Sequence, residues 1–109
     1  MTNEQINISI AETCGWNSIR EQDYDHGYSG FDDVRQMWVG LNPDSDEFEQ
    51  IPDYCNDLNA MHEAEKMLNK EQWVAYGREL SRLGVFPMVH ATAAQRAEAF
   101  LRTLGKWEE

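Results

Sequence analysis

Residues 92–104 read Thr-Ala-Ala-Gln-Arg-Ala-Glu-Ala-Phe-Leu-Arg-Thr-Leu and decide the helical character of the chain. Thr92 precedes Gln95 by three positions, the capping-box spacing at which each side chain bonds an amide left free at a helix start. The apolar residues recur at helical spacing and form one stripe: Ala93, Ala97, Phe100, Leu101 and Leu104. The sequence therefore predicts a buried helix over 93–104 that ends before Gly105, with alanines small enough for close packing.

A second capping box, from Thr2 to Gln5, lies at the start of the sequence. The apolar residues behind it keep the spacing of one helix face: Ile6, Ile10 and Cys14. The alternation of isoleucines over 6–10 would also suit a strand, but the capping box and Gly15 favour a helix that ends at the glycine. Trp16 then occupies the position from which a side chain packs back on the helix.

A third capping box, from Asn69 to Gln72, predicts a helix that ends at Gly84. Its apolar side consists of Trp73, Tyr76, Leu80 and Leu83. The helix before it is expected to begin within 53–57 and to end at Leu68. Its apolar face consists of Tyr54, Leu58, Met61, Ala64 and Leu68. The very short link between these two helices predicts a tight helical hairpin.

The composition describes one acidic domain. The chain has 109 residues, 41% of them hydrophobic, which suits a single core. Its 20 acids against 9 Lys and Arg give a formal net charge of −11, so nucleic acids and anionic membranes are poor partners. Residues 1–10 lack a signal-peptide pattern, and no apolar run approaches the roughly 20 residues of a membrane span. Without an export signal, Cys14 and Cys55 are expected to be reduced, partly buried thiols.

Negative charge is concentrated between residues 17 and 52. Nine acids there face only two bases, Arg20 and Arg35, whereas acids and bases are interleaved elsewhere. Turn-forming glycine, asparagine and proline residues are frequent in the same stretch. We interpret 17–52 as a long, acidic, loop-rich insertion with at most one strand, over 34–40.

These segments predict an α+β fold that is predominantly helical, within a single domain over 1–109. About four helices are expected, with at most a small two-stranded β element. The two strands would be 34–39 and the proline-interrupted run 85–90, which equally suits an extended linker.

Two long stretches carry a resemblance to known proteins: IPDYCNDLNAMHEAEKML (51–68) and ATAAQRAEAFLRTLGKW (91–107). A similar opening pattern consists of Ile8, Ala11, Cys14, Gly15 and Trp16. Together they resemble a family of small phage and prophage proteins, some of which are labelled phage ABA sandwich domain. The resemblance implies a viral or prophage origin, expression in the host bacterial cytoplasm, and helices packed against a small sheet. It implies no reaction and does not extend to residues 17–52.

Calcium is the first metal that so many carboxylates suggest. The segment from Asp23 to Val34 begins like a calcium loop, but its glycine comes one position early and valine cannot ligate at the twelfth position. The segment from Asn42 to Asp53 has acids at suitable early positions, yet Glu47 stands where the turn needs glycine. We interpret both segments as solvated acidic loops and retain a Ca²⁺-dependent module as an alternative.

Zinc binding and nucleophilic catalysis both need cysteine or histidine side chains that meet in space. The available residues are Cys14, His26, Cys55, His62 and His90. They form no paired-ligand motif, and the chain has no nucleophile elbow, phosphate-binding glycine loop or dinucleotide fingerprint. The sequence therefore predicts no metal, no cofactor and no catalytic residue, in a chain that is not an enzyme.

The leading hypothesis is a non-enzymatic phage accessory protein whose helices are a scaffold and whose residues 17–52 bind another protein. Its acids would imitate phosphate toward a basic surface of a host or phage protein, in an anti-defence or host-takeover role. The predicted partner-binding residues are Asp23, Asp25, Asp32, Asp33, Trp38, Asp44, Asp46, Glu47 and Glu49. A structural, self-assembling phage component is the other alternative.

Overall fold

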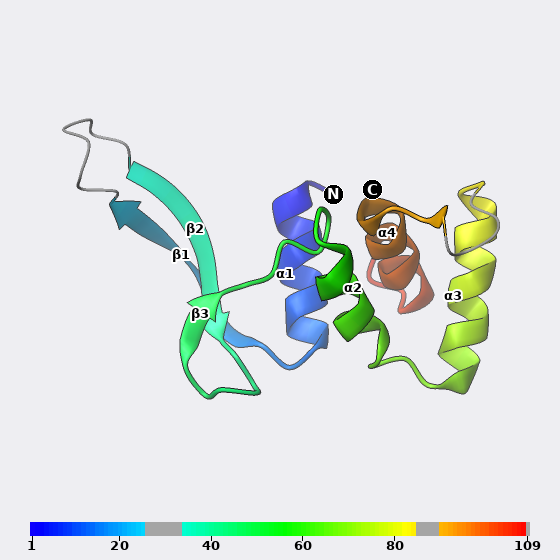
Figure 1. The fold of residues 1–109 in the computed structure, drawn as a ribbon, viewed down its shortest axis with the longest axis horizontal. Coiled ribbons are helices and arrows are strands. Elements are labelled where there is room, and N and C mark those ends of the chain that lie inside the picture. Colours follow the sequence, from blue (N-terminus) through cyan, green and yellow to red (C-terminus); the bar gives the residue numbers. More distant parts are fainter. Residues whose placement is uncertain (26–33, 85–89, 109) are drawn as a thin grey trace.

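The structure is a computed structural model that describes residues 1–25, 34–84 and 90–108. Within these residues the chain forms four helices and a three-stranded antiparallel sheet (Figure 1). In chain order the elements are α1 (Asn3–Thr13), β1 (Asn17–Asp25), β2 (Val34–Leu41), β3 (Phe48–Gln50), α2 (Leu58–Glu65), α3 (Lys70–Arg82) and α4 (Ala93–Thr103). The predicted α+β, mainly helical class is confirmed.

The helix starts follow the chemistry that the sequence predicts. All three capping boxes form, at the beginnings of α1, α3 and α4. In α3, for example, the Gln72 amide donates to Asn69 Oδ1 at 2.8 Å, while the Asn69 amide donates to Gln72 Oε1 at 2.9 Å. The helix α2 begins later than expected because Asp57, not Asp53, accepts hydrogen bonds from the first free amides.

Helix α4 is the centre of the helical body. The helices α1, α2 and α3 all pack against it (Figure 1). Its buried residues therefore lie on more than one face of the helix: Ala93, Arg96, Ala97, Ala99, Phe100 and Leu101. The alanines keep the neighbouring helices close, as the sequence predicts. The predicted hairpin is wrong in its packing, because α2 and α3 each lie on α4 and not along one another.

A buried ion pair joins two of these helices. Arg96 of α4 donates from Nη1 to Glu65 Oε1 of α2 at 3.1 Å, and both side chains are only 7% exposed. Arg96 also donates from Nε to the Ala91 carbonyl at 3.4 Å. The Tyr76 hydroxyl of α3 lies beside this pair, buried and without a well-formed hydrogen bond in the described part of the chain. The pair therefore fixes how α2 and α4 meet.

The described parts of 17–52 contain three paired strands, so the prediction of an irregular insertion with at most one strand is wrong for them. The strand β2 lies in the middle, paired with β1 from Asn17↔Leu41 to Asp25↔Val34 and with β3 from Val39↔Gln50 to Leu41↔Phe48. The partner predicted for 34–39 was 85–90, of which 85–89 lie outside the described residues. Here β1 and β3 pair with β2 instead, so the β element has three strands and not two.

The sheet joins the helices through Trp16 and Gly40. Gly15 adopts a positive φ of 98° and ends α1, and the Trp16 amide then donates to the Ala11 carbonyl at 3.0 Å. The indole of Trp16 is buried in the core, as predicted. A Cβ on Gly40 would lie 2.9 Å from Ile19 Cγ1 and 3.4 Å from Trp16 Cε3, so only glycine lets β2 approach these side chains so closely.

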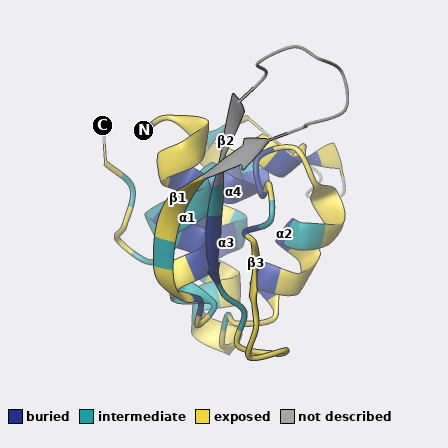
Figure 2. Ribbon diagram, turned by 90° about the vertical axis from the view of Figure 1, so that its left-hand side faces the viewer, coloured by how far each residue is buried: buried dark blue, intermediate teal, exposed yellow. Residues whose placement is uncertain are grey.

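Two residues predicted for the core are exposed. Trp73 is 42% exposed and Leu58 is 41% exposed, whereas Tyr76 and Met61 on the same two helices are fully buried. Both exposed residues lie in the first turn of their helix. Figure 2 shows the exposed outer surfaces of the helices around the buried interior.

The two ends of the described chain meet on the helical side of the molecule. The Met1 amino group donates to the Glu108 carbonyl at 3.2 Å. Figure 1 places both ends between α1 and α4, away from the sheet. The sheet is therefore the part of the described structure that lies farthest from α3, at the other end of a body of 49 × 27 × 24 Å.

Candidate functional site

The turn between β2 and β3 is acidic and tightly hydrogen-bonded; we call residues 42–47 the acidic turn. Asn42 organises it: its amide donates to the Glu47 carbonyl at 2.9 Å, its carbonyl accepts from the Asp46 amide at 2.8 Å, and its Oδ1 accepts from the Asp44 amide at 2.9 Å. The Asn42 side-chain amide donates to Glu49, which also accepts from Ser45 Oγ at 3.2 Å. These bonds hold the turn in one conformation.

Three carboxylates of the acidic turn are exposed and not used to hold it together: Asp44, Asp46 and Glu47. The ion pairs of the described side chains all lie within or between helices, at Glu63–Lys66, Glu79–Arg82, Glu65–Arg96 and Glu98–Arg102. Arg20, the basic residue of β1, lies over the Phe48 ring, with Cζ 5.0 Å from its centroid. Within the described residues, the turn therefore keeps its negative charge.

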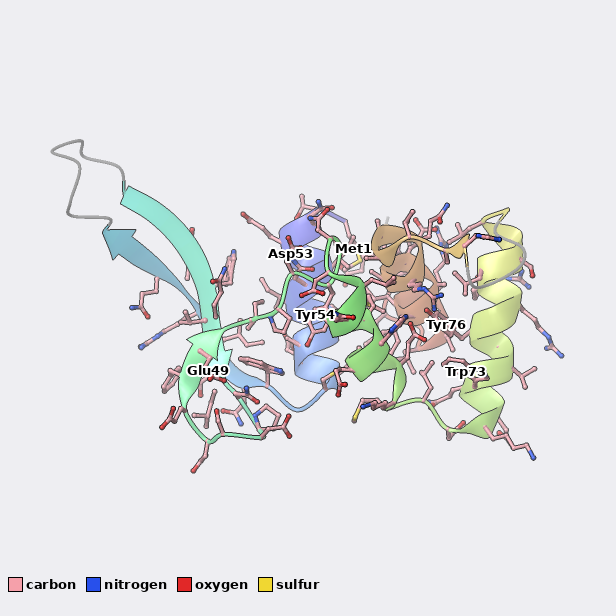
Figure 3. All side chains as sticks on the ribbon, in the orientation of Figure 1. Met1, Glu49, Asp53, Tyr54, Trp73 and Tyr76 are labelled. Carbon is pink, nitrogen blue, oxygen red and sulfur yellow. The ribbon has the colours of Figure 1, made fainter. Side chains whose placement is uncertain are left out.

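The predicted partner-binding residues fall into four groups. Asp44, Asp46 and Glu47 lie in the acidic turn, and Glu49, labelled in Figure 3, lies next to it in β3 and accepts hydrogen bonds from the turn. Asp23 and Asp25 belong to β1 and pair through the backbone with Gln36 and Val34. Asp32 and Asp33 lie outside the described residues. Trp38 belongs to β2.

Trp38 packs against the helical core. It is half-buried and lines a depression of about 270 Å³ together with Asn3 and Asn7 of α1. Its indole N–H is buried and finds no hydrogen-bond acceptor in the described part of the chain. This position suits a residue that attaches the sheet to α1, and the partner-binding role of Trp38 stays a prediction.

The opposite face of the sheet carries a contact that the sequence does not reveal. Arg20, Val39 and Gln50 are paired across the three strands, so their side chains share one face, and alternation places Phe48 on it as well. Trp38 lies on the other face, toward α1. Phe48 is 52% exposed under the Arg20 guanidinium, beside the acidic turn. An exposed aromatic ring thus adjoins the charged turn.

The calcium hypothesis is not supported by the geometry of 42–53. Phe48–Gln50 form β3, which takes the middle of the supposed loop into the sheet. Asp53, the supposed twelfth ligand, accepts hydrogen bonds from Asn7 Nδ2 at 3.1 Å and Asn56 Nδ2 at 3.0 Å, beside α1. Across the described residues, no group of three or more His, Cys, Asp and Glu side chains could hold a metal ion.

The cysteines and described histidines do not converge either. Cys14 and Cys55 are free thiols, as predicted, and burial raises the pKa of both, that of Cys55 to about 11. The Tyr54 hydroxyl lies beside the Cys14 sulfur, whereas the Cys55 thiol lies 3.8 Å from the Asn3 carbonyl. His62 and His90 are exposed, and His26 lies outside the described residues. Protonated thiols are weak nucleophiles, so this arrangement offers no activated cysteine.

Two buried tyrosines are expected to make the folded protein less stable at alkaline pH. Burial raises the pKa of Tyr54 and of Tyr76 well above the ordinary value near 10. Each group keeps its proton longer when folded than when unfolded, so its stabilising contribution is complete below pH 10 and is lost as pH rises further. We expect the free energy of unfolding to fall above pH 10, by up to about 1.4 kcal/mol per pH unit for each tyrosine. Urea denaturation at several pH values measures this slope.

The variant Tyr54→Phe/Tyr76→Phe is the control, because it removes both hydroxyls and keeps the rings. It should show a clearly shallower loss of stability between pH 10 and 11 than the unchanged protein. Equal slopes would mean that lysines or thiols account for the pH dependence.

The comparisons with known proteins leave the chain without an assigned relative. No protein-family model, no curated protein and no solved structure matches it. The resemblance to small phage proteins therefore stays a prediction. Among the described helices, none has the length and apolar character needed to cross a membrane.

Proposed function

We propose that this chain is a non-enzymatic accessory protein that binds a basic surface of another protein through the sheet and its acidic turn. The resemblance to phage and prophage proteins adds that the partner is a host or phage protein in a bacterial cytoplasm. In this proposal the helices are the scaffold that holds the sheet at one end of the molecule.

The observation that carries the proposal is a fixed turn with uncompensated charge. Asp44, Asp46 and Glu47 are exposed on a turn whose backbone is already hydrogen-bonded, so binding costs little additional ordering of the chain. Carboxylates held in place attract a basic surface from a distance and orient it on contact.

Phe48 adds an apolar contact to this charged surface. Its ring is half exposed beside the turn, and the guanidinium of Arg20 lies over it in a cation–π contact. Aromatic side chains that are partly exposed in the free protein are common anchors in protein interfaces. The outer face of the sheet therefore combines charge for steering with a ring for burial.

The test compares capture of proteins from a bacterial lysate by the unchanged chain and by Glu21→Gln/Asp46→Asn/Glu47→Gln. All three acids are exposed: Asp46 and Glu47 belong to the turn, and Glu21 belongs to β1, on the face that also carries Trp38. Among the described residues, no hydrogen bond or ion pair uses their carboxylates. Asparagine suits position 46, which has a positive φ of 58°. We expect the variant to lose at least about tenfold in affinity for the captured partner, and less at high salt, because three charges that steer association are removed.

The matched control is Glu4→Gln/Glu12→Gln/Glu71→Gln, which changes the net charge by the same amount at exposed positions of α1 and α3. This control should capture the partner as well as the unchanged chain does. Equal capture by all three proteins would rule out the sheet as the charged binding surface. Equal loss in both variants would show that net charge alone matters.

A further inference from the structure

A pocket lies where the acidic turn meets the helices. It has a volume of about 390 Å³ and lies between the end of α1, the acidic turn, the chain before α2, and α2 itself. Figure 3 shows Tyr54, one of its lining residues, between α1 and α2. We call it the junction pocket, because it is lined by both the sheet unit and the helical body.

The walls of the junction pocket are largely apolar. They include the ring of Trp16, the prolines Pro43 and Pro52, and the Met67 side chain. Met67 is 54% exposed, so part of this wall has no cover in the described structure. Flat rings and a flexible thioether form a surface against which an alkyl chain or a planar cation can pack.

The rim of the pocket is charged. It holds Asp44, Glu63 and Lys66, and Lys66 Nζ donates to Glu63 Oε1 at 2.8 Å. That pair leaves Asp44 as the rim carboxylate without a basic partner among the described side chains. An apolar wall with one uncompensated carboxylate at its edge is complementary to a long side chain that ends in a positive charge.

The interior of the pocket offers a neutral acceptor. The Tyr54 hydroxyl lies beside the Cys14 sulfur, and its oxygen has lone pairs that can accept a hydrogen bond from a ligand. Both residues line the pocket. A ligand with several N–H groups could therefore be bound by Asp44 at the rim and by Tyr54 farther in.

We propose that the junction pocket binds an arginine side chain of the partner protein. The aliphatic stem packs on the apolar wall while the guanidinium bonds to Asp44. Arginine fits better than lysine, because its planar group stacks on rings and prolines and its five N–H groups can serve two acceptors at once. The inference rests on the proposed function, since it specifies how a basic partner is anchored beside the acidic turn.

The test is an NMR titration of the intact chain with N-acetyl-arginine amide, at fixed pH and ionic strength. The reporters are the Trp16 indole N–H and the Met67 methyl group, which both line the pocket. We expect saturable shifts of both signals with a Kd of roughly 1–10 mM, the range for a small fragment. The uncharged isostere N-acetyl-citrulline amide should bind at least about fivefold more weakly, because it lacks the charge that Asp44 attracts.

Two variants and a control locate the site. Asp44→Asn should weaken arginine-amide binding about fivefold, whereas Glu12→Gln, an equal charge change on α1 outside the pocket, should leave it unchanged. Ala60→Leu should fill the pocket from α2 and abolish the saturable shifts. Unchanged signals of Tyr76, which is buried on the far side of α2, would show that each variant is folded.

Three results would overturn the inference: no saturable shift, equal binding of arginine and citrulline amides, or equal weakening by Asp44→Asn and Glu12→Gln. The outcome is separate from that of the lysate experiment, whose variants leave the junction pocket unaltered. Capture that depends on the sheet acids, without arginine binding, would retain the proposed function and remove the pocket. Arginine binding without such capture would retain the pocket and remove the proposed function.

Discussion

Replacing Arg96 with methionine is expected to lower the free energy of unfolding by about 3–5 kcal/mol. The reason is that Glu65 would remain buried without the guanidinium that bonds both of its carboxylate oxygens, at 3.1 and 3.4 Å. A buried charge without a partner costs far more than the lost pair contributes. Because small domains are stable by only about 5–15 kcal/mol, this is a large share of the total. Urea denaturation followed by tryptophan fluorescence measures the change.

The double variant Glu65→Leu/Arg96→Met separates charge burial from lost packing. It removes both charges and keeps apolar volume between α2 and α4, so it should recover most of the stability lost in Arg96→Met. A loss below about 1 kcal/mol in the single variant would show instead that water reaches Glu65. The stability of Arg96→Lys should lie between those of Arg96→Met and the double variant, because lysine keeps the positive charge but lacks the planar guanidinium.

Replacing Phe100 with alanine is expected to cost about 3–5 kcal/mol. The ring is 0% exposed and lies on the central helix α4, which α1, α2 and α3 all contact. Its removal leaves a cavity that three helices cannot all close, because each is held by other contacts with α4. The midpoint of urea denaturation should fall while its slope stays similar.

Trp73→Ala is the informative comparison. The sequence places Trp73 and Phe100 equally in the core, yet Trp73 is 42% exposed and makes a ring contact with Tyr76 at 5.5 Å between centroids. We expect its loss to cost about 1 kcal/mol, as for a contact at the surface. Similar losses for both variants would contradict the packing described for α3.

The helices could be predicted from the sequence because their ends are chemically marked. Each capping box consists of two side chains three positions apart that satisfy each other's amides, whatever packs around them. The errors concern which helical residues are covered. Leu58 and Trp73 follow the helical period, but both lie in the first turn of their helix and remain exposed. The periodicity of a sequence predicts which face of a helix is apolar. It does not predict which part of that face a neighbouring helix covers.

The sheet could not be predicted in the same way. Strand β1 reads Asn-Ser-Ile-Arg-Glu-Gln-Asp-Tyr-Asp, with too few apolar residues to show the alternation of a half-buried strand. It pairs with β2 through backbone hydrogen bonds. The pairing register shifts between Asn17 and Arg20, where Ser18 has a positive φ of 53°. Strand β3 has only three residues, all exposed. Pairing between polar strands depends on tertiary contacts, which local patterns do not encode.

The negative charge of the candidate site could be predicted from the sequence, but its three-dimensional arrangement could not. The acids of 42–47 stand out in the sequence, and the structure gathers them on one turn. The Arg20–Phe48 contact and the junction pocket have no local sequence signal, because each joins residues from different elements. The hydrogen bonds of Asn42 are local to the turn and agree with the turn chemistry of an Asn-Pro pair. The role of Trp38 is ambiguous in the sequence for a related reason: an aromatic residue among acids suits either a binding surface or the underside of a sheet, and the structure packs it against the helical core.

The meeting of Met1 and Glu108 has a topological consequence. A short peptide bridge could close the backbone into a ring without displacing α1 or α4. Ring closure would restrict the unfolded chain while leaving the folded one unchanged, and so would raise the free energy of unfolding through entropy alone. The sheet, at the opposite end of the molecule, would keep its shape and its access to solvent in the cyclic protein.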